Sequence, residues 1–180
     1  MNQTSQLGIT KTFQITHIFP RLSVFENVRI SAQSRKTSFN FWKKADSLEE
    51  VNKKTRKILE MVKLADSHDR AASTLSHGER KYLEIGIALA TDPKLLLLDE
   101  PTANLDPNSA AIIEKAIVNK KSEERIIVMA THNLAQARRM ADEIVHIYNG
   151  EIVEVASPEQ FFENPKSEIS RKFVSGELEF

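Results

Sequence analysis

The run "LLLLDEPTANLD", which begins at Leu95, places four consecutive leucines directly before two carboxylates. The leucines do not alternate with polar residues, and a proline stands close to each end of the run. A short apolar run of this kind is typical of a strand covered on both faces of a parallel sheet. Ligands of open α/β sheets bind beyond the carboxyl ends of the strands. The run therefore predicts a buried strand that presents Asp99 and Glu100 to a ligand.

A second apolar run, "RIIVMATHN", covers residues 125–133 and predicts another buried strand, which ends in Thr131 and His132. The carboxyl ends of parallel strands meet at one edge of a sheet, so we expect His132 near Asp99 and Glu100. Two carboxylates and an imidazole suit the metal-assisted hydrolysis of a phosphate ester. The alternative is that Asp99 and Glu100 only begin the turn at the next proline.

Helix starts are marked by local capping patterns. Ser47 with Glu50, and Ser76 with Glu79, form S-x-x-E capping boxes, and each precedes residues at helical spacing. Asp106 followed by proline predicts a third start. A further helix, after residue 133, has an asparagine as its expected cap. Strands that alternate with helices in this way predict an α/β domain with parallel core strands.

The remaining segments are read from turn residues and composition. Asn149-Gly150 joins two alternating runs and predicts a β-hairpin. Ser157 followed by proline predicts a short helix, and the last residues, from 163, receive no assignment. Residues 31–46 are polar and basic and are interpreted as a loop or insertion. The aromatic residues between Phe39 and Trp42 form either a surface for a membrane subunit or a packed part of that insertion.

Composition narrows the class of protein. The 180 residues contain 25 basic and 25 acidic side chains, which argues against a nucleic-acid partner. The absence of cysteine excludes disulfides and thiolate metal sites. No apolar run reaches the roughly 20 residues that cross a bilayer, and no signal peptide is recognisable. We therefore expect a cytoplasmic chain that reaches a membrane only through a partner.

The central block "LSHGERKYLEIGIALATDPKLLLLDEPTANLD" resembles the signature helix, Walker B strand and D-loop of ATP-binding subunits of ABC transporters. "ATHN" resembles their switch-histidine loop and "TKTFQ" their Q-loop, so the resemblance spans nearly the whole chain. "LSHGE" and "TFQITHIFPRLSVFENVRI" are similar to the group that serves branched-chain amino acid importers. His77, Asn104 and Asn133 depart from the commonest family residues. The histidines at positions 17, 68 and 146 match no motif.

The resemblance implies roles for the sheet edge. Asp99 would hold Mg²⁺, Glu100 would be the catalytic base, and His132 would be the switch residue. Gln14 would contact Mg²⁺ or the attacking water and report on the nucleotide to a membrane subunit. Without the rest of the match, Gln14 would be an ordinary surface residue.

The resemblance also implies roles at the subunit seam. Ser76, His77 and Gly78 would grip the γ-phosphate of ATP bound to a second ATPase subunit. Helix N-termini attract anions, which is the physical basis of that role. Asp106 would belong to the D-loop that crosses the seam. The alternative is that Ser76 and Asp106 only cap their own helices, and both roles are compatible. Asn104 replaces a frequent glycine and tolerates the left-handed backbone of that turn.

The implied fold is a partial P-loop NTPase fold of the ABC type: parallel core strands flanked by helices, a helical insertion and a C-terminal β-hairpin. We expect one domain over 1–180, with a helical part at 23–75. The motifs and hairpin would occupy 76–156, and a helix with its tail 157–180. None of the five glycines lies in a G-x-x-x-x-G-K-[ST] loop, so no such loop cradles the phosphates. We therefore expect an N-terminally truncated cassette, Walker A missing, that alone hydrolyses ATP negligibly.

The implied function is that of an ATPase subunit that powers an importer of amino acids, with ATP and Mg²⁺ as cofactors. Its partners would be membrane permease subunits, a second ATPase subunit in a homo- or heterodimer, and indirectly a substrate-binding protein. It would lie peripherally on the inner face of the membrane. The tail "ENPKSEISRKFVSGELEF" instead resembles importers of oxyanions such as tungstate or phosphate. The motifs are also compatible with a degenerate, non-catalytic module that pairs with an intact subunit, and with an ABC-type ATPase without a permease.

Overall fold

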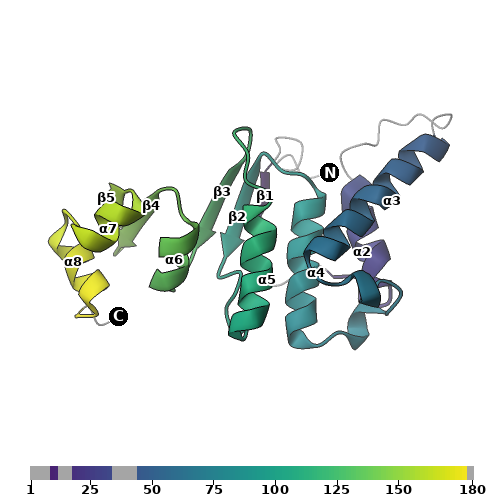
Figure 1. The fold of residues 1–180 in the computed structure, drawn as a ribbon, viewed down its shortest axis with the longest axis horizontal. Helices are drawn as coiled ribbons and strands as arrows, with labels where there is room; N and C mark the ends of the chain where they lie inside the picture. Colours follow the sequence, from purple (N-terminus) through teal and green to yellow (C-terminus); the bar gives the residue numbers. More distant parts are fainter. Residues whose placement is uncertain (1–8, 12–17, 34–43, 178–180) are drawn as a thin grey trace. The chain divides into compact units, whose positions relative to one another are not determined.

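A computed structural model describes the backbone of residues 9–11, 18–33 and 44–177, and the side chains of residues 18–33 and 49–177. The chain forms two compact units, Met1–Ala130 and Thr131–Phe180 (Figure 1). Gln14 and the segment from Phe39 to Trp42 lie outside the described residues. Within the described ranges, no helix combines the length and the apolar character that a bilayer crossing requires.

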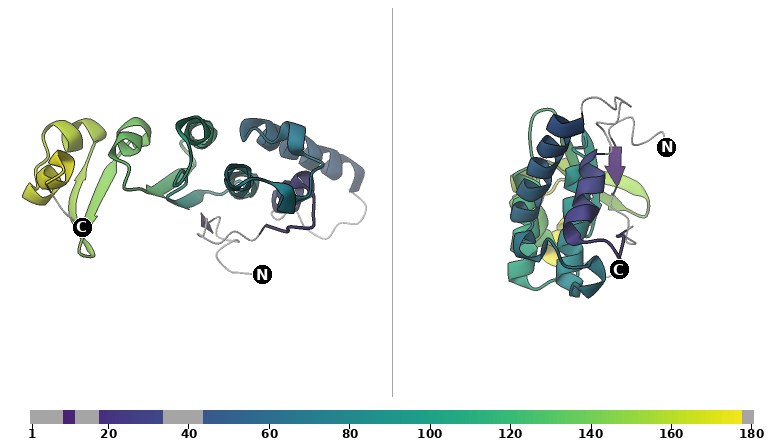
Figure 2. Two further views of the ribbon diagram at one scale, coloured as in Figure 1. Left: turned by 90° about the horizontal axis from the view of Figure 1, so that it is seen from below. Right: turned by 90° about the vertical axis from the view of Figure 1, so that its right-hand side faces the viewer.

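The first unit contains a three-stranded parallel sheet in the order β1 (Ile9–Lys11), β2 (Leu95–Asp99), β3 (Ile126–Ala130). The predicted parallel strands are therefore confirmed. Helix α5 (Pro107–Val118) connects β2 to β3 and lies on one face of the sheet (Figures 1 and 2). Neighbouring parallel strands need a long crossover connection, which is usually a helix.

The prediction that β2 and β3 are covered on both faces is wrong. Leu96 and Leu98 are buried, but Ile126 is 65% exposed and Val128 is 50% exposed. Paired residues of neighbouring strands share a face, so these exposed side chains and the half-buried Leu95 and Leu97 belong to one open face. An unbroken apolar run fits both a one-sided and a two-sided strand, because the covering elements lie elsewhere in the chain.

Three helices of the same unit pack together: α2 (Val24–Gln33), α3 (Lys44–Met61) and α4 (His77–Ala90) (Figure 2). Two 3₁₀ turns, η1 (Ala65–Ser67) and η2 (Ala72–Thr74), join α3 to α4. The helices approach closely at Gly86, where an added Cβ would lie 3.4 Å from Val62 Cγ2 and 3.6 Å from Ile58 Cγ2.

The helix boundaries correct two predictions. The loop expected over residues 31–46 is narrower, because α2 continues to Gln33 and α3 begins at Lys44. Ser47 consequently lies inside the first turn of α3 and cannot be its N-cap. No proline or glycine stands between residues 31 and 47, so nothing in the local sequence prevents the helix from starting before its capping pattern.

The second unit contains α6 (Leu134–Met140), β4 (Ile144–Tyr148), β5 (Glu151–Ala156), α7 (Pro158–Glu163) and α8 (Glu168–Ser175). Strands β4 and β5 form the predicted antiparallel hairpin. Asn149 and Gly150 adopt φ angles of 51° and 82°, as the two-residue turn requires. The helix predicted after Ser157 is confirmed as α7.

Helix α8 forms in the tail that the sequence left unassigned. Its start is bonded by a distant side chain, because Glu154 of β5 accepts hydrogen bonds from the amides of Lys166 (2.9 Å) and Ser167 (3.1 Å). The helix ends at Gly176, which has a φ of 78°. Glu154 therefore anchors the two residues that precede α8, whose N-cap residue Ser167 makes no side-chain capping bond.

Candidate functional site

Asp99 and Glu100 stand side by side at the carboxyl end of β2. Asp99 is exposed and pairs in register with Ala130 of β3. The Glu100 amide donates to the Ala130 carbonyl at 3.0 Å, and the Glu100 carbonyl accepts from the Ala103 amide at 3.1 Å. Glu100 has a φ of 42°, which is uncommon for a residue with a side chain. Bonds on both sides hold this unusual backbone in place, and such strain concentrates at functional sites.

His132 is exposed and begins the second unit with Thr131. It follows Ala130, the strand partner of Asp99, after a single residue. The next residue, Asn133, caps α6 as predicted: its Oδ1 accepts from the Gln136 amide at 3.0 Å. The Asn133 amide donates to Thr131 Oγ1 at 3.1 Å. His132 therefore lies between the end of β3 and a defined helix start.

The start of α4 carries the predicted capping box. The Glu79 amide donates to Ser76 Oγ at 3.3 Å, and the Ser76 amide donates to Glu79 Oε2 at 2.8 Å. Within the described part of the chain, no group accepts a hydrogen bond from the amide of His77 or Gly78. Two amides of the first turn thus remain able to bind an anion, in addition to the favourable helix dipole.

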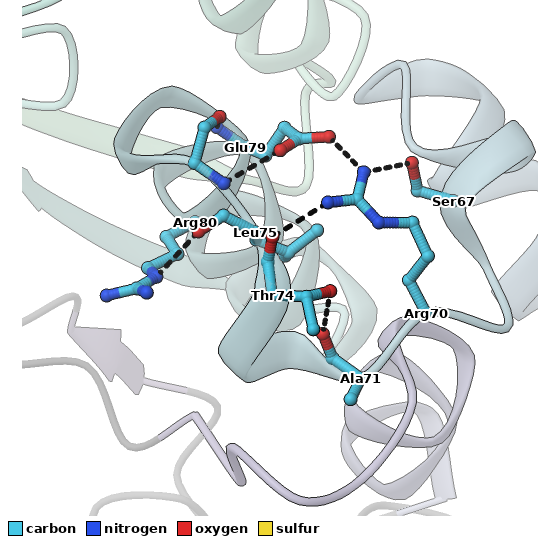
Figure 3. A network of polar contacts seen from close by, with 8 residues as sticks. Ser67, Arg70, Ala71, Thr74, Leu75, Glu79 and Arg80 are labelled. Atoms are coloured by element: carbon cyan, nitrogen blue, oxygen red, sulfur yellow. Dashed lines mark hydrogen bonds and ion pairs between the residues drawn. The ribbon is translucent and has the colours of Figure 1, made fainter.

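Arg70 holds the capping box from outside the helix (Figure 3). Its Nη1 donates to Glu79 Oε1 at 2.7 Å and to Ser67 Oγ at 3.2 Å, and its Nη2 donates to the Thr74 carbonyl at 2.8 Å. The hydrogen bond from the Ser76 amide lowers the pKa of Glu79, and the Arg70 guanidinium adds to that effect against a desolvation cost. Glu79 is therefore held as a carboxylate at neutral pH.

The loop after Glu100 passes close to the start of α4. A Cβ added at Gly78 would lie 3.8 Å from Leu105 Cδ2, which is ordinary contact. Asn104 has a φ of 60°, so it takes the left-handed backbone expected of it. Asp106 caps α5 as predicted, because its Oδ1 accepts from the amides of Asn108 (3.0 Å) and Ser109 (3.1 Å).

The charge of Asp106 is stabilised within this cap. A hydrogen bond from the Ser109 hydroxyl, together with the bonds from the amides, lowers the pKa of Asp106. A capping carboxylate retains further lone pairs, so the cap is compatible with a role of Asp106 at a subunit seam. That role stays a prediction.

The carboxylates at the sheet edge fit a magnesium–phosphate site better than a protein-only metal cage. Among the described residues, no three His, Cys, Asp or Glu side chains gather as metal ligands. Mg²⁺ usually takes one or two protein carboxylates and completes its shell with waters and phosphate oxygens. Asp99, beside Glu100 and exposed at the end of β2, meets that requirement.

Two groups of the predicted site residues are brought together within the first unit. Asp99 and Glu100 form one group, and Gly78 with the loop before Asp106 forms the other. Sequence reasoning missed Arg70, since it matches no motif and its partner Glu79 lies nine positions later.

Comparisons with known proteins identify the relatives of this chain. Residues 2–103 match the protein family described as ABC transporter. The phosphate import ATP-binding protein PstB of Pyrobaculum aerophilum is 38% identical over 170 residues, which cover 92% of this chain and 65% of that protein. The L-cystine import ATP-binding protein TcyC of Bacillus subtilis is 36% identical, with 91% and 63% covered. The chain thus spans slightly less than two thirds of the length of these relatives.

A solved structure matches the fold. It is the ADP conformation of an ATP-binding cassette of an ABC transporter, which superposes with a TM-score of 0.71 at 28% identity. The superposition covers 94% of this chain and 70% of that structure. The expected α/β fold with parallel strands and flanking helices is thereby confirmed.

Proposed function

The chain belongs to the ABC transporter family, and from this premise we propose that it serves in the ATP-binding and ATP-hydrolysing subunit of an importer. The 180 residues contain no phosphate-cradling loop, so the activity is proposed for the assembled transporter and not for these residues alone. The observation that carries the proposal is the backbone of Glu100. Its positive φ, fixed by hydrogen bonds to Ala130 and Ala103, holds a carboxylate at the ligand-binding edge of the sheet. Backbone strain of this kind is often found at functional sites, although loop residues such as Lys63 and Asp92 also have a positive φ here.

The proposed site uses the residues that follow the strands. Asp99 would hold Mg²⁺, directly or through water, and Glu100 would orient or deprotonate the attacking water. The family resemblance gives Gln14, which lies outside the described residues, as a further ligand. Mg²⁺ supplies neutralisation of the charge that develops on the phosphate oxygens. The switch role is assigned to His132 from its motif, which follows β3 in the sequence.

The proposed seam lies at the start of α4. Ser76, His77 and Gly78 receive the γ-phosphate of ATP that is bound to a second ATPase subunit. The amides of His77 and Gly78 are the donors, and Asp106 carries the adjacent loop toward the same seam. Residues 23–75 form the helical part of the cassette, residues 76–156 carry the motifs and the hairpin, and residues 157–180 form the C-terminal part.

The proposed cargo is phosphate or a related oxyanion. Relatives that match 92% of this chain are named for phosphate import, including those of Pyrobaculum aerophilum and Thermococcus kodakarensis. The expected membership of the branched-chain amino acid group is not confirmed by these relatives. Amino-acid import is retained as the second candidate, because the cystine import protein of Bacillus subtilis covers 91% of the chain.

The proposed partners are two membrane permease subunits, a second ATPase subunit and, indirectly, a substrate-binding protein. The chain then lies peripherally on the inner face of the cell membrane. The competing assignment is a non-catalytic module that only supplies its signature residues to another subunit. Only the catalytic assignment requires the Glu100 carboxylate.

Uptake by cells that carry Glu100→Gln on this chain tests the proposal. We expect the variant to lose uptake of radiolabelled phosphate while uptake of labelled cystine and leucine is unchanged. Loss of cystine or leucine uptake alone would replace the oxyanion with an amino acid as cargo. Unchanged uptake of all three compounds would contradict a transport function for this chain.

A further inference from the structure

We propose that Arg70 is a positioning residue that keeps the start of α4 attractive to an anion by neutralising the capping carboxylate of Glu79. The inference rests on the proposed function for the place where phosphate binds. It assigns a role to a residue outside every motif of the sequence.

The capping box places a negative charge beside the amides that would bind an anion. Glu79 Oε2 lies 2.8 Å from the amide of Ser76, so a negative charge is fixed within the first turn of the helix. The amides of His77 and Gly78, which remain for an anion, belong to the same turn. A phosphate bound to those amides would meet a like charge within about one helical turn, which we take as about 6 Å.

Arg70 forms an ion pair with this carboxylate. Its Nη1 lies 2.7 Å from Glu79 Oε1, the carboxylate oxygen that does not bond to Ser76. The side chain of Arg70 is 43% exposed and that of Glu79 is 27% exposed, so water screens the pair only in part. The pair therefore presents an uncharged cap to the anion.

The guanidinium is held in place by neutral acceptors as well (Figure 3). Ser67 Oγ and the Thr74 carbonyl accept from Arg70, so its position does not depend on Glu79 alone. The backbone of Arg70 is also fixed, because its carbonyl accepts from the Val24 amide at 2.9 Å at the start of α2. Arg70 thus joins the start of α2 to the start of α4.

The expected effect follows from Coulomb's law. With an effective dielectric constant of about 40–80, as expected for a partly exposed pair in salt, one uncompensated charge at about 6 Å weakens the binding of an anion about threefold to tenfold. Lysine at position 70 keeps the charge but loses the forked geometry, so it should restore only part of the affinity.

Steady-state ATP hydrolysis by the assembled transporter tests the inference. We expect Arg70→Met to raise the KM for ATP about threefold to tenfold with little change in kcat, and Arg70→Lys to give an intermediate KM. The double variant Arg70→Met/Glu79→Gln should return the KM to the wild-type value. Glutamine keeps the oxygen that caps Ser76 and removes the charge. Added salt should reduce the difference between Arg70→Met and wild type.

Two outcomes would overturn the role of Arg70: an unchanged KM in Arg70→Met, or a double variant no better than Arg70→Met. Arg138→Met is the matched control, because Arg138 pairs with Glu163 at 3.1 Å in the second unit, and its KM should equal that of wild type. Glu100→Gln separates the two proposals. If that variant hydrolyses ATP normally, the proposed function fails, whereas a silent Arg70→Met with an inactive Glu100→Gln refutes only the role of Arg70.

Discussion

Replacing Gly78 with alanine should separate binding from folding. Gly78 is the second residue of α4, and its φ is not positive. An added Cβ would meet only Leu105 Cδ2, at 3.8 Å, among the described residues. The fold of the chain therefore leaves room for alanine at this position. If glycine is needed there, the need comes from what binds to the start of the helix.

The substitution should stabilise the fold but impair ATP hydrolysis. Alanine gains up to about 1 kcal/mol over glycine in a helix interior, and we expect about half of that in the first turn. That gain raises the Tm by roughly 1–2 °C. The methyl group, however, occupies the space beside the amides of His77 and Gly78. The methyl group removes neither amide but hinders a phosphate from reaching them, so we expect a loss of ATP hydrolysis that approaches the roughly 100-fold cost of losing one donor to a reacting oxyanion.

The assay pairs thermal unfolding, followed by circular dichroism, with ATP hydrolysis by the assembled transporter. Gly86→Ala is the matched control, because the same substitution in the same helix meets Val62 and Ile58 rather than a ligand. We expect its tight contacts and its gain in helix propensity roughly to cancel, and hydrolysis to be retained. Normal hydrolysis in Gly78→Ala, or a loss that merely parallels a fall in Tm, would refute the reasoning.

Two further predictions concern the second unit. Glu154→Ala should leave the amides of Lys166 and Ser167 without their acceptor, which costs about 2 kcal/mol or more, and should accelerate hydrogen exchange throughout α8. Glu154→Gln, which keeps one acceptor oxygen, should lie between alanine and wild type, and equal exchange in all three proteins would contradict the docking role. His146 is buried, and its Nδ1 lies 2.9 Å from Ser170 Oγ. Burial lowers the pKa of His146 from its ordinary value of 6.5, although Glu154 opposes that shift. The unfolded chain therefore binds more protons below pH 6.5, so the stability is complete above that pH and decreases as the pH falls toward the folded pKa. Exchange rates of β4 and α8, corrected for intrinsic rates, should rise between pH 7.5 and pH 5.5, and His146→Gln should remove that dependence; a pH-independent wild type would contradict the prediction.

Local features were predictable from the sequence because their partners are close along the chain. The capping box of Ser76 and Glu79 spans three residues, and the Asn149-Gly150 turn needs no distant contact. The same pattern failed at Ser47, where α3 begins three residues earlier. A capping box marks a start only where something stops the helix from extending backwards.

Features that depend on distant residues were not predictable. The open face of β2 and β3 reflects which elements cover the sheet, and a run of leucines does not encode that. Helix α8 depends on Glu154, which lies twelve positions before Lys166. Gly176 was a local signal for the end of that helix, but its start lacks a side-chain cap. The same holds for the site residues. Asp99 and Glu100 were predictable because they directly follow one apolar strand, whereas Arg70 is recognised only from its contacts in the structure.

The catalytic role of the Glu100 carboxylate is the central claim. Its most direct test measures ATP turnover and bound nucleotide together in the assembled transporter, for wild type and Glu100→Gln. We predict that the variant retains bound ATP while turnover falls by about 100-fold or more, because glutamine cannot accept the proton of the attacking water. Turnover equal to that of wild type would contradict the catalytic role of Glu100.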